Sequence, residues 1–132
     1  MHKILQPEGW ARPKGYSNGM SASGESIFVA GQIGWNQDCE FESDDFVDQC
    51  RLALQNIVAV LQVANAGPEH ITRMTWYVTD KKEYLSRGAD LGQVYREVIG
   101  KNFPVMSAVQ VVALMEDRAQ VEIEVTAVKP AE

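Results

Sequence analysis

The sequence has 132 residues, a length that predicts one compact domain spanning residues 1–132. It carries 18 acidic and 12 basic residues, and its basic residues are scattered. The resulting net charge of −6 argues against a protein that works by neutralising nucleic-acid phosphates. No apolar run reaches about 18 residues, so no membrane span is expected. The N-terminus also lacks an apolar signal region, and we therefore predict a cytoplasmic protein.

The two cysteines, Cys39 and Cys50, do not predict a metal site. They lie eleven positions apart, form no Cys-x-x-Cys pair and have no pair of histidines nearby. Cys50 falls on the apolar side of a predicted helix, where a cysteine behaves as a small hydrophobic residue. Cys39 lies between acidic residues in a polar loop, which disfavours a reactive thiolate.

Residues 6–19 predict a loop, because prolines and glycines punctuate them, with room for a short strand from residue 16 to residue 20. Two large aromatic residues, Trp10 and Tyr16, stand out in this polar segment. Tyr16 has two open interpretations: it clamps the N-terminal arm onto the core, or it forms the wall of a pocket. For Trp10 the clamping role is favoured. Ser26–Ala30 is short and rich in β-forming residues, which predicts a strand.

The first of two long helices is predicted over residues 44–66. Apolar residues recur there at three- and four-residue spacing, which gives one apolar stripe. Ser43 is the expected N-cap, and Gly67 is the expected stop. A stripe of this kind is far more often part of the core than a site for a partner, so we assign it to the core.

A strand and a second helix follow. Residues 71–79 alternate between an apolar face and a more polar face, which is typical of a strand. Asp80 is placed to cap the next helix, and Glu83 stands three residues later, as in a capping box. The apolar periodicity then continues to Gly100, where the second helix is expected to end.

Residues 102–111 predict a ligand site at the entry of a strand. Pro104 forbids a simple helical continuation and favours an extended conformation for Phe103. The alternation that follows puts Met106, Ala108 and Gln110 on one face of the strand. The last predicted strand, residues 120–128, also alternates strictly between apolar and polar residues.

These elements predict an α+β fold: a mixed sheet with both long helices packed on one face. The other face is expected to carry the polar alternates together with Ala108, Gln110 and Thr126. A sheet face that is neither strongly apolar nor strongly charged is typical of contact with another subunit. We therefore predict a homo-oligomer.

Several local motifs, in this order along the chain, make the sequence resemble the Rid family. These are the reactive-intermediate deaminases, once labelled translation inhibitors or endoribonucleases of the L-PSP type. The motifs are Gly15-Tyr16 with Gly19, residues 29–33 (Val-Ala-Gly-Gln-Ile) with Asn36, the helix segment 49–56, residues 75–78 with Asp80, Phe103-Pro104 with Ser107 and Val109, and residues 121–124 (Val-Glu-Ile-Glu) with Ala127-Val128.

The resemblance implies a chorismate-mutase-like α+β fold and a homotrimer whose sheets pack inward, with a cleft at each subunit interface. Deaminating members of the family hydrolyse enamines and imines to 2-keto acids and ammonia without a cofactor. Their clefts use a tyrosine near the N-terminus, an arginine two residues after Phe-Pro, and a glutamate on the last strand that positions the attacking water.

The residues at these positions of the present chain match the family only in part. The tyrosine corresponds to Tyr16 and the glutamate to Glu122, but Met106 stands where the deaminases carry the arginine. The resemblance further places Ala108 at a position that is often cysteine and Gln110 at one that is frequently glutamate. A guanidinium donates charge-assisted hydrogen bonds to a substrate carboxylate, whereas methionine prefers apolar and aromatic contacts.

A cleft lined by Met106, Trp35 and Tyr16 predicts a flatter, less acidic or more apolar ligand. Three other cations are candidates to replace the arginine: Arg12, Lys14 and Arg73.

The first functional hypothesis is an enzyme that deaminates an imine or enamine metabolite, with Glu122 as the proton-shuttling group. In the alternative interpretation Glu122 is only a polar residue on an alternating strand.

The second hypothesis is a trimer that binds a small metabolite without turnover, as a sensor or scavenger. The third, a nuclease or translation inhibitor, is disfavoured by the acidic balance and the absence of a basic groove.

Overall fold

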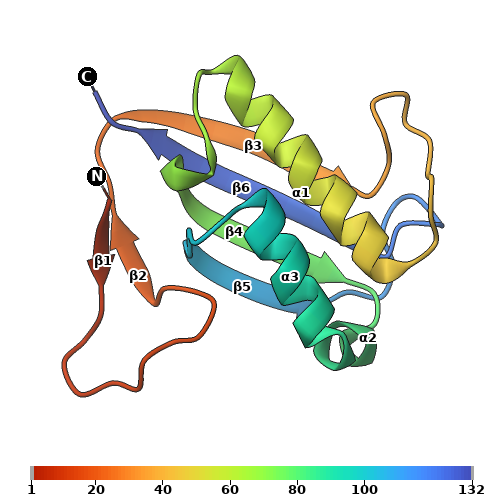
Figure 1. The fold of residues 1–132 in the computed structure, drawn as a ribbon, viewed down its shortest axis with the longest axis horizontal. Coiled ribbons are helices and arrows are strands. Elements are labelled where there is room, and N and C mark those ends of the chain that lie inside the picture. Colours follow the sequence, from red (N-terminus) through yellow and green to blue (C-terminus); the bar gives the residue numbers. More distant parts are fainter. Residues whose placement is uncertain (1, 132) are drawn as a thin grey trace.

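The central sheet has four strands in the order β3-β6-β4-β5 (Figure 1). The computed structural model describes residues 2–131 and places these strands at Glu25–Ile33, Val121–Lys129, Ile71–Val78 and Val105–Gln110, respectively. β6 is antiparallel to both β3 and β4, whereas β4 and β5 are parallel. The predicted mixed sheet is confirmed, and β5 forms one of its edges.

α1 (Phe46–Val63) starts and ends inside the predicted range 44–66. The cap is Asp45 rather than Ser43, because the Asp45 carboxylate accepts a hydrogen bond from the Asp48 backbone N–H at 3.1 Å. The helix ends before Gly67, because Asn65 adopts the left-handed conformation with a φ of 55°. Asparagine tolerates this conformation better than most residues, so it ends the helix where a glycine was expected.

The second predicted long helix is two helices, α2 (Lys81–Ser86) and α3 (Gly88–Val98). Asp80 caps α2 as predicted, accepting from the backbone N–H groups of residues 82 and 83. The break falls at Arg87, whose guanidinium binds Asp45, Glu83 and Asp90 at 3.0–3.1 Å. Glu83 therefore pairs with Arg87 instead of closing a capping box. Among residues 2–131, no helix has the length and apolar character needed to cross a membrane.

The N-terminal segment forms a hairpin that the sequence did not predict as such. β1 (Lys3–Leu5) pairs with β2 (Gly19–Ser21) in a separate two-stranded sheet. Ser17 fixes this segment to the entry of β5: its backbone N–H donates to the Pro104 carbonyl at 3.1 Å, and its hydroxyl donates to the Phe103 carbonyl at 2.6 Å. A short 3₁₀ helix, Pro68–His70, precedes β4.

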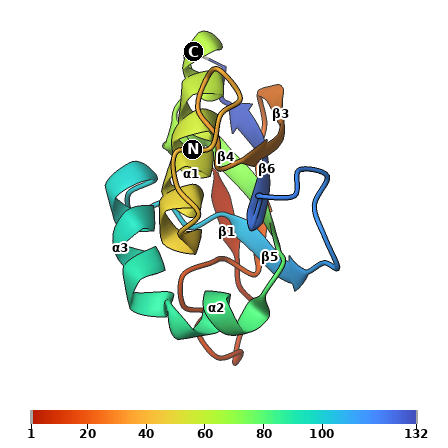
Figure 2. The same ribbon diagram turned by 90° about the vertical axis from the view of Figure 1, so that its right-hand side faces the viewer.

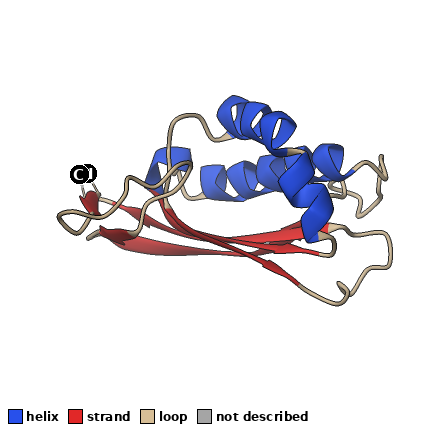
Figure 3. Ribbon diagram, turned by 90° about the horizontal axis from the view of Figure 1, so that it is seen from below, coloured by secondary structure: helices blue, strands red, loops and turns tan. Residues whose placement is uncertain are grey.

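The core lies between the sheet and the helices, which all cover the same face of the sheet (Figure 3). Along β6 the inward residues Val121, Ile123, Val125 and Ala127 are at most 3% exposed, while Glu122, Glu124 and Thr126 lie on the other face. The segment between β5 and β6 extends away from the helices (Figure 2). No described element covers the second face of the sheet, which we call the open face.

The predicted position of β5 residues on the open face is wrong. Met106, Ala108 and Gln110 are in register with Met74, Trp76 and Val78 of β4, all three of which are buried under the helices. Neighbouring residues in register point to the same side of a sheet, so Met106, Ala108 and Gln110 belong to the helix side. The open face of β5 carries Val105, Ser107 and Val109 instead.

Candidate functional site

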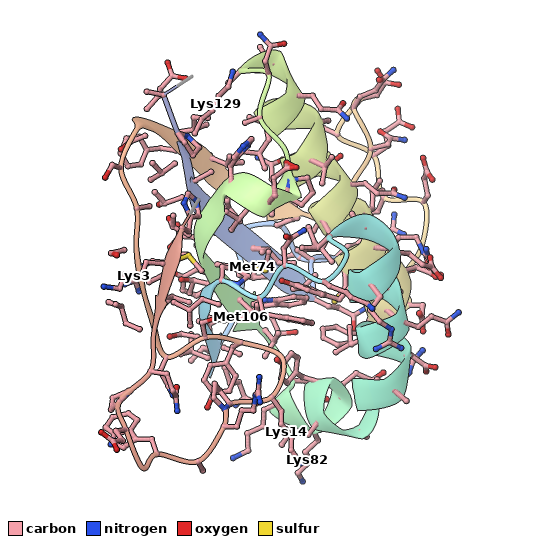
Figure 4. The ribbon with its side chains drawn as sticks, turned by 60° about the vertical axis from the view of Figure 1, so that its left-hand side comes forward. Lys3, Lys14, Met74, Lys82, Met106 and Lys129 are labelled. Carbon is pink, nitrogen blue, oxygen red and sulfur yellow. The ribbon has the colours of Figure 1, made fainter. Side chains whose placement is uncertain are left out.

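Met106 lies on the helix side of β5, where it packs against the core (Figure 4). Two features place it there. Pro104 is buried directly before β5, and the parallel register then sets Met106 beside Met74. The side chain is only half-buried, since it forms part of the wall of a cavity between β5, α2 and α3.

This cavity, which we call the Met106 pocket, has a volume of about 440 Å³. That volume is within the range of about 300–1,000 Å³ that is usual for small-molecule sites. Four aromatic rings line it: Trp76, Tyr84, Tyr95 and Phe103. Tyr95 and Phe103 stack at 5.9 Å between ring centroids, and Trp76 meets Tyr84 edge-on at 6.1 Å. Met106 thus has aromatic neighbours within one chain, but they are not the predicted Trp35 and Tyr16.

Two aromatic donors on this wall have no acceptor among residues 2–131. The indole N–H of Trp76 is buried without a hydrogen-bond partner. The Tyr84 hydroxyl also makes no hydrogen bond with a described residue, and burial raises the pKa of this phenol, so it stays protonated at neutral pH. Tyr95 differs, because its hydroxyl donates to the Asn102 carbonyl at 2.5 Å. Its role is to hold the turn before Phe103.

Tyr16 lines a different cavity, which lies under the N-terminal hairpin and has a volume of about 590 Å³. Arg12 and Trp10 also line this cavity, and Phe103 borders both cavities. Tyr16 is 41% exposed, so within one chain it is not clamped into the core. Tyr16 thus borders a cavity, but within one chain this cavity is separate from that of Met106.

The three cations proposed to replace the arginine lie in three different places. Arg12 belongs to the cavity under the hairpin, and Arg73 lies on the open face beside Phe28 and Glu124. Only Lys14 shares the Met106 pocket. Arg96 also lines this pocket, and the sequence interpretation missed it. The four-residue spacing of Tyr84, Gly88, Gly92 and Arg96, all of which line the pocket, was the pattern that could have revealed it.

Glu122 lies on the open face of β6, in register with Tyr77 of β4 and Ile33 of β3. Its side chain lies against Gly31, where a Cβ atom would come within 2.5 Å of the Glu122 carboxylate. Gly31 is thus required for this close approach, at an irregularity in β3 between residues 29 and 32. No side chain among residues 2–131 pairs with the half-buried Glu122 carboxylate, in contrast to Glu124, which accepts from the Tyr77 hydroxyl at 2.8 Å.

The structure does not bring Gln110 or Trp35 to Met106 within one chain. The Gln110 side-chain oxygen accepts from the backbone N–H of Lys81 at 2.7 Å, so this amide holds the start of α2. Trp35 follows β3, at the edge of the sheet opposite to β5, and packs on Phe41 at 5.7 Å. Residues 2–131 also contain no cluster of three histidine, cysteine or acidic side chains suited to a metal ion.

The fold and the pocket define a class of protein: an α+β chain with one covered and one open sheet face, and an aromatic cavity at the edge strand. Comparison with known proteins assigns the family. Residues 10–129 match the model of the family described as Endoribonuclease L-PSP, and the chain belongs to this family. The resemblance to Rid proteins is thereby confirmed.

The relatives of this chain span nearly its whole length. A RutC family protein of Pyrococcus horikoshii is 33% identical over 131 residues, which cover 98% of this chain and 99% of the relative. The Escherichia coli K12 protein named "Putative reactive intermediate deaminase TdcF" is 32% identical over 111 residues, which cover 82% of each chain. The crystal structure of YyfB from Yersinia pestis, a Rid-family protein described as being of unknown function, superposes with a TM-score of 0.86 at 28% identity and covers 97% of this chain and 98% of its own.

Proposed function

We propose that this protein hydrolyses an imine or enamine metabolite to a ketone and ammonia, in clefts between the subunits of a homotrimer. Membership of the family and the name of the TdcF relative support this reaction class. Met106 in place of the family's arginine means that substrate recognition is non-standard. The observation that carries the proposal is the Met106 pocket itself, because this aromatic cavity includes the position at which the resemblance expects the arginine of the deaminases.

The positions of Met106 and Glu122 support a site made from two copies of the chain. Met106 lies on the helix side of the sheet and Glu122 on the open face, so the sheet separates them within one chain. A cleft that holds both groups requires Glu122 from a neighbouring copy. The open face carries apolar side chains suited to such contact: Phe28 is 77% exposed and Val109 is 44% exposed.

The reaction needs an oriented water molecule and a group that moves protons. The water oxygen bonds to the imine carbon, and one of its protons passes to the nitrogen, which gives a carbinolamine. The C–N bond then breaks, the hydroxyl proton moves to the nitrogen, and ammonia leaves behind a C=O group. Glu122 is suited to both proton transfers, because a carboxylate can accept a proton and return it, and this one is only half-buried.

The test measures hydrolysis of 2-imino acids that an amino-acid oxidase generates in the assay. We expect the wild-type protein to accelerate ammonia release and Glu122→Gln to reduce the rate about 10²-fold or more, because general acid–base catalysis contributes about 10²–10⁴-fold. Glu124→Gln is the matched control, since Glu124 lies on the same face of the same strand and is bound by Tyr77. We expect it to retain the wild-type rate. Equal loss in both variants, or no activity of the wild type on any imine, would contradict the proposal.

Met106→Arg provides a second arm of this experiment. If the cleft is otherwise that of the family's deaminases, the new guanidinium binds the carboxylate of small imino acids and raises activity on them. A non-catalytic metabolite-binding trimer is the second candidate function, and the loss of the arginine at Met106 favours it. Ligand binding to the wild type with no hydrolysis in either protein would support that alternative.

A further inference from the structure

Two glycines of α3 line the Met106 pocket, Gly88 at the start of the helix and Gly92 one turn later. Glycine is a poor helix residue, since it loses more backbone entropy on folding than alanine and offers no side chain to pack. A glycine inside a helix therefore calls for a reason, and two reasons are common. The backbone adopts a conformation that other residues avoid, or a neighbouring atom leaves no room for a Cβ atom.

Neither reason applies to Gly88 or Gly92. Both have ordinary helical backbones, without the positive φ seen at Gly15 or Gly100. A Cβ atom on Gly88 would have no heavy atom within 4 Å. On Gly92 its nearest contact would be the Arg96 Nη1 atom at 3.4 Å, at the far end of a flexible side chain.

Other glycines in this chain show what a packing requirement looks like. A Cβ atom on Gly34 would lie 2.4 Å from the Gln49 Cβ atom, and one on Gly31 would lie 2.5 Å from the Glu122 carboxylate. Gly88 and Gly92 instead leave space empty above the helix. That space belongs to the Met106 pocket, so the effect of the two glycines is to enlarge the cavity next to its aromatic wall.

The charge around the pocket is positive although the chain as a whole is acidic. Lys14 and Arg96 both line the pocket, and no aspartate or glutamate does. Neither cation forms an ion pair with any of residues 2–131, whereas Arg51, Arg87 and Arg118 all do. Both side chains belong to exposed residues, which places the charges at the mouth of the cavity. Such an arrangement attracts an anionic group while the interior accommodates an apolar one.

We propose that the Met106 pocket takes an aromatic 2-imino acid, with the aryl ring over Gly88 and Gly92 and the carboxylate at Lys14 and Arg96. This inference rests on the proposed deaminase function for its reaction and names the substrate class of the same site. The ring occupies the space that a side chain at position 88 or 92 would fill, against Tyr84 and Trp76. The aryl side chain distinguishes such a substrate from small imino acids, which leave that space empty.

Binding of the stable product analogue phenylpyruvate tests the inference without requiring turnover. Titration of the intact protein, followed by calorimetry or protein NMR, is expected to give a dissociation constant at least tenfold lower for phenylpyruvate than for pyruvate. Gly88→Leu and Gly92→Leu should each weaken phenylpyruvate binding tenfold or more. Ala89→Leu is the matched control, because Ala89 is an exposed residue of the same helix and does not line the pocket. It should leave the affinity unchanged.

Gly92→Ala guards against the possibility that the leucine variants simply fail to fold. An alanine at this helical position should raise the midpoint of thermal unfolding and still weaken phenylpyruvate binding, a combination that general damage to the fold does not produce. For the charges, Lys14→Met with Arg96→Met should weaken phenylpyruvate binding at low salt. Lys82→Met, an exposed lysine of α2 that does not line the pocket, is its control.

The outcomes separate this inference from the proposed function. Selective phenylpyruvate binding that the glycine variants abolish, without hydrolysis of any imine, supports the ligand class and contradicts the deaminase function. Hydrolysis of small imino acids with equal affinity for pyruvate and phenylpyruvate overturns the ligand class and leaves the deaminase function standing. Unchanged phenylpyruvate binding in Gly88→Leu and Gly92→Leu likewise overturns the inference.

Discussion

The two faces of the sheet differ in how completely one chain defines them. On the helix side, the inward residues of β6 are at most 3% exposed and pack against α1. The same strand carries Glu122, Glu124 and Thr126 on the open face, where no described element covers them. Of the two residues proposed for the site, Met106 lies on the helix side and Glu122 on the open face.

The helix side is therefore packed within one chain, whereas the open face is left uncovered by the described residues. The helix side contains a core and a pocket whose lining residues all come from one chain. The open face offers a carboxylate without a partner and an exposed aromatic ring, Phe28. In the proposed trimer this face contacts a neighbouring subunit. Substitutions on the helix side should then affect folding stability, and substitutions on the open face should affect assembly.

The largest effect is expected from Ile123→Ala, on the helix side of β6. Ile123 is completely buried, and removing its side chain should lower the free energy of unfolding by about 2–5 kcal/mol. Thr126→Ala, on the open face of the same strand, should change it by no more than about 0.5 kcal/mol. Urea unfolding of both variants at one protein concentration measures the contrast. If both variants lost a similar free energy of unfolding, the two faces of β6 would contribute equally to stability and the comparison would fail.

Phe28→Ala should act on assembly rather than on folding of the chain. If the open face is the trimer contact, loss of this ring should weaken association by about 2 kcal/mol, or about 30-fold. Val63→Ala is the control, because Val63 is also highly exposed, at 86% against 77% for Phe28, but lies at the end of α1 on the helix side. Sedimentation over a dilution series compares the two. An unchanged oligomer in Phe28→Ala, or dissociation in Val63→Ala, would contradict the assignment of the interface.

The alternation of residues in the strands was enough to predict the fold and the inward face of β6. It did not place β5 correctly, because Met106, Ala108 and Gln110 are ambiguous in polarity and only the parallel register with β4 decides their side. The break at Arg87 was also beyond the sequence pattern, since apolar periodicity runs through it and the cause is an ion network with a residue 42 positions away.

The sequence could name candidate site residues only where single positions matched a family motif. Met106 and Glu122 were found from their positions in family motifs, but their separation by the sheet requires the strand register. Arg96 and Lys14 meet at one pocket although they are far apart in the sequence. The hydrogen bond by which the Gln110 side-chain oxygen holds the start of α2 had no signal in the sequence, because the pairing depends on how β5 and α2 meet in space.

The smallest expected effect concerns Asp45, whose pairing with Arg87 ties α1 to the helices that form the wall of the Met106 pocket. The Arg87 guanidinium holds the pKa of the Asp45 carboxyl below its usual value of 3.8, and the cap bond from Asp48 adds to this. A lowered pKa in the folded state stabilises the protein fully above pH 3.8, and this contribution is lost as the pH falls through the lower folded value.

Asp45→Ala removes both the cap and the charge, and it should lower the free energy of unfolding by about 1 kcal/mol at neutral pH. Asp45→Asn keeps a capping oxygen and should lower the free energy of unfolding by less. The difference in stability between Asp45→Asn and the wild type should shrink in acid. Urea unfolding at pH 7 and near pH 3 measures both variants. Because Asp45 acts on the helix side, the oligomeric state should stay that of the wild type. If the oligomer of an Asp45 variant dissociated while the chain stayed folded, the helices would also contribute to the contact between subunits.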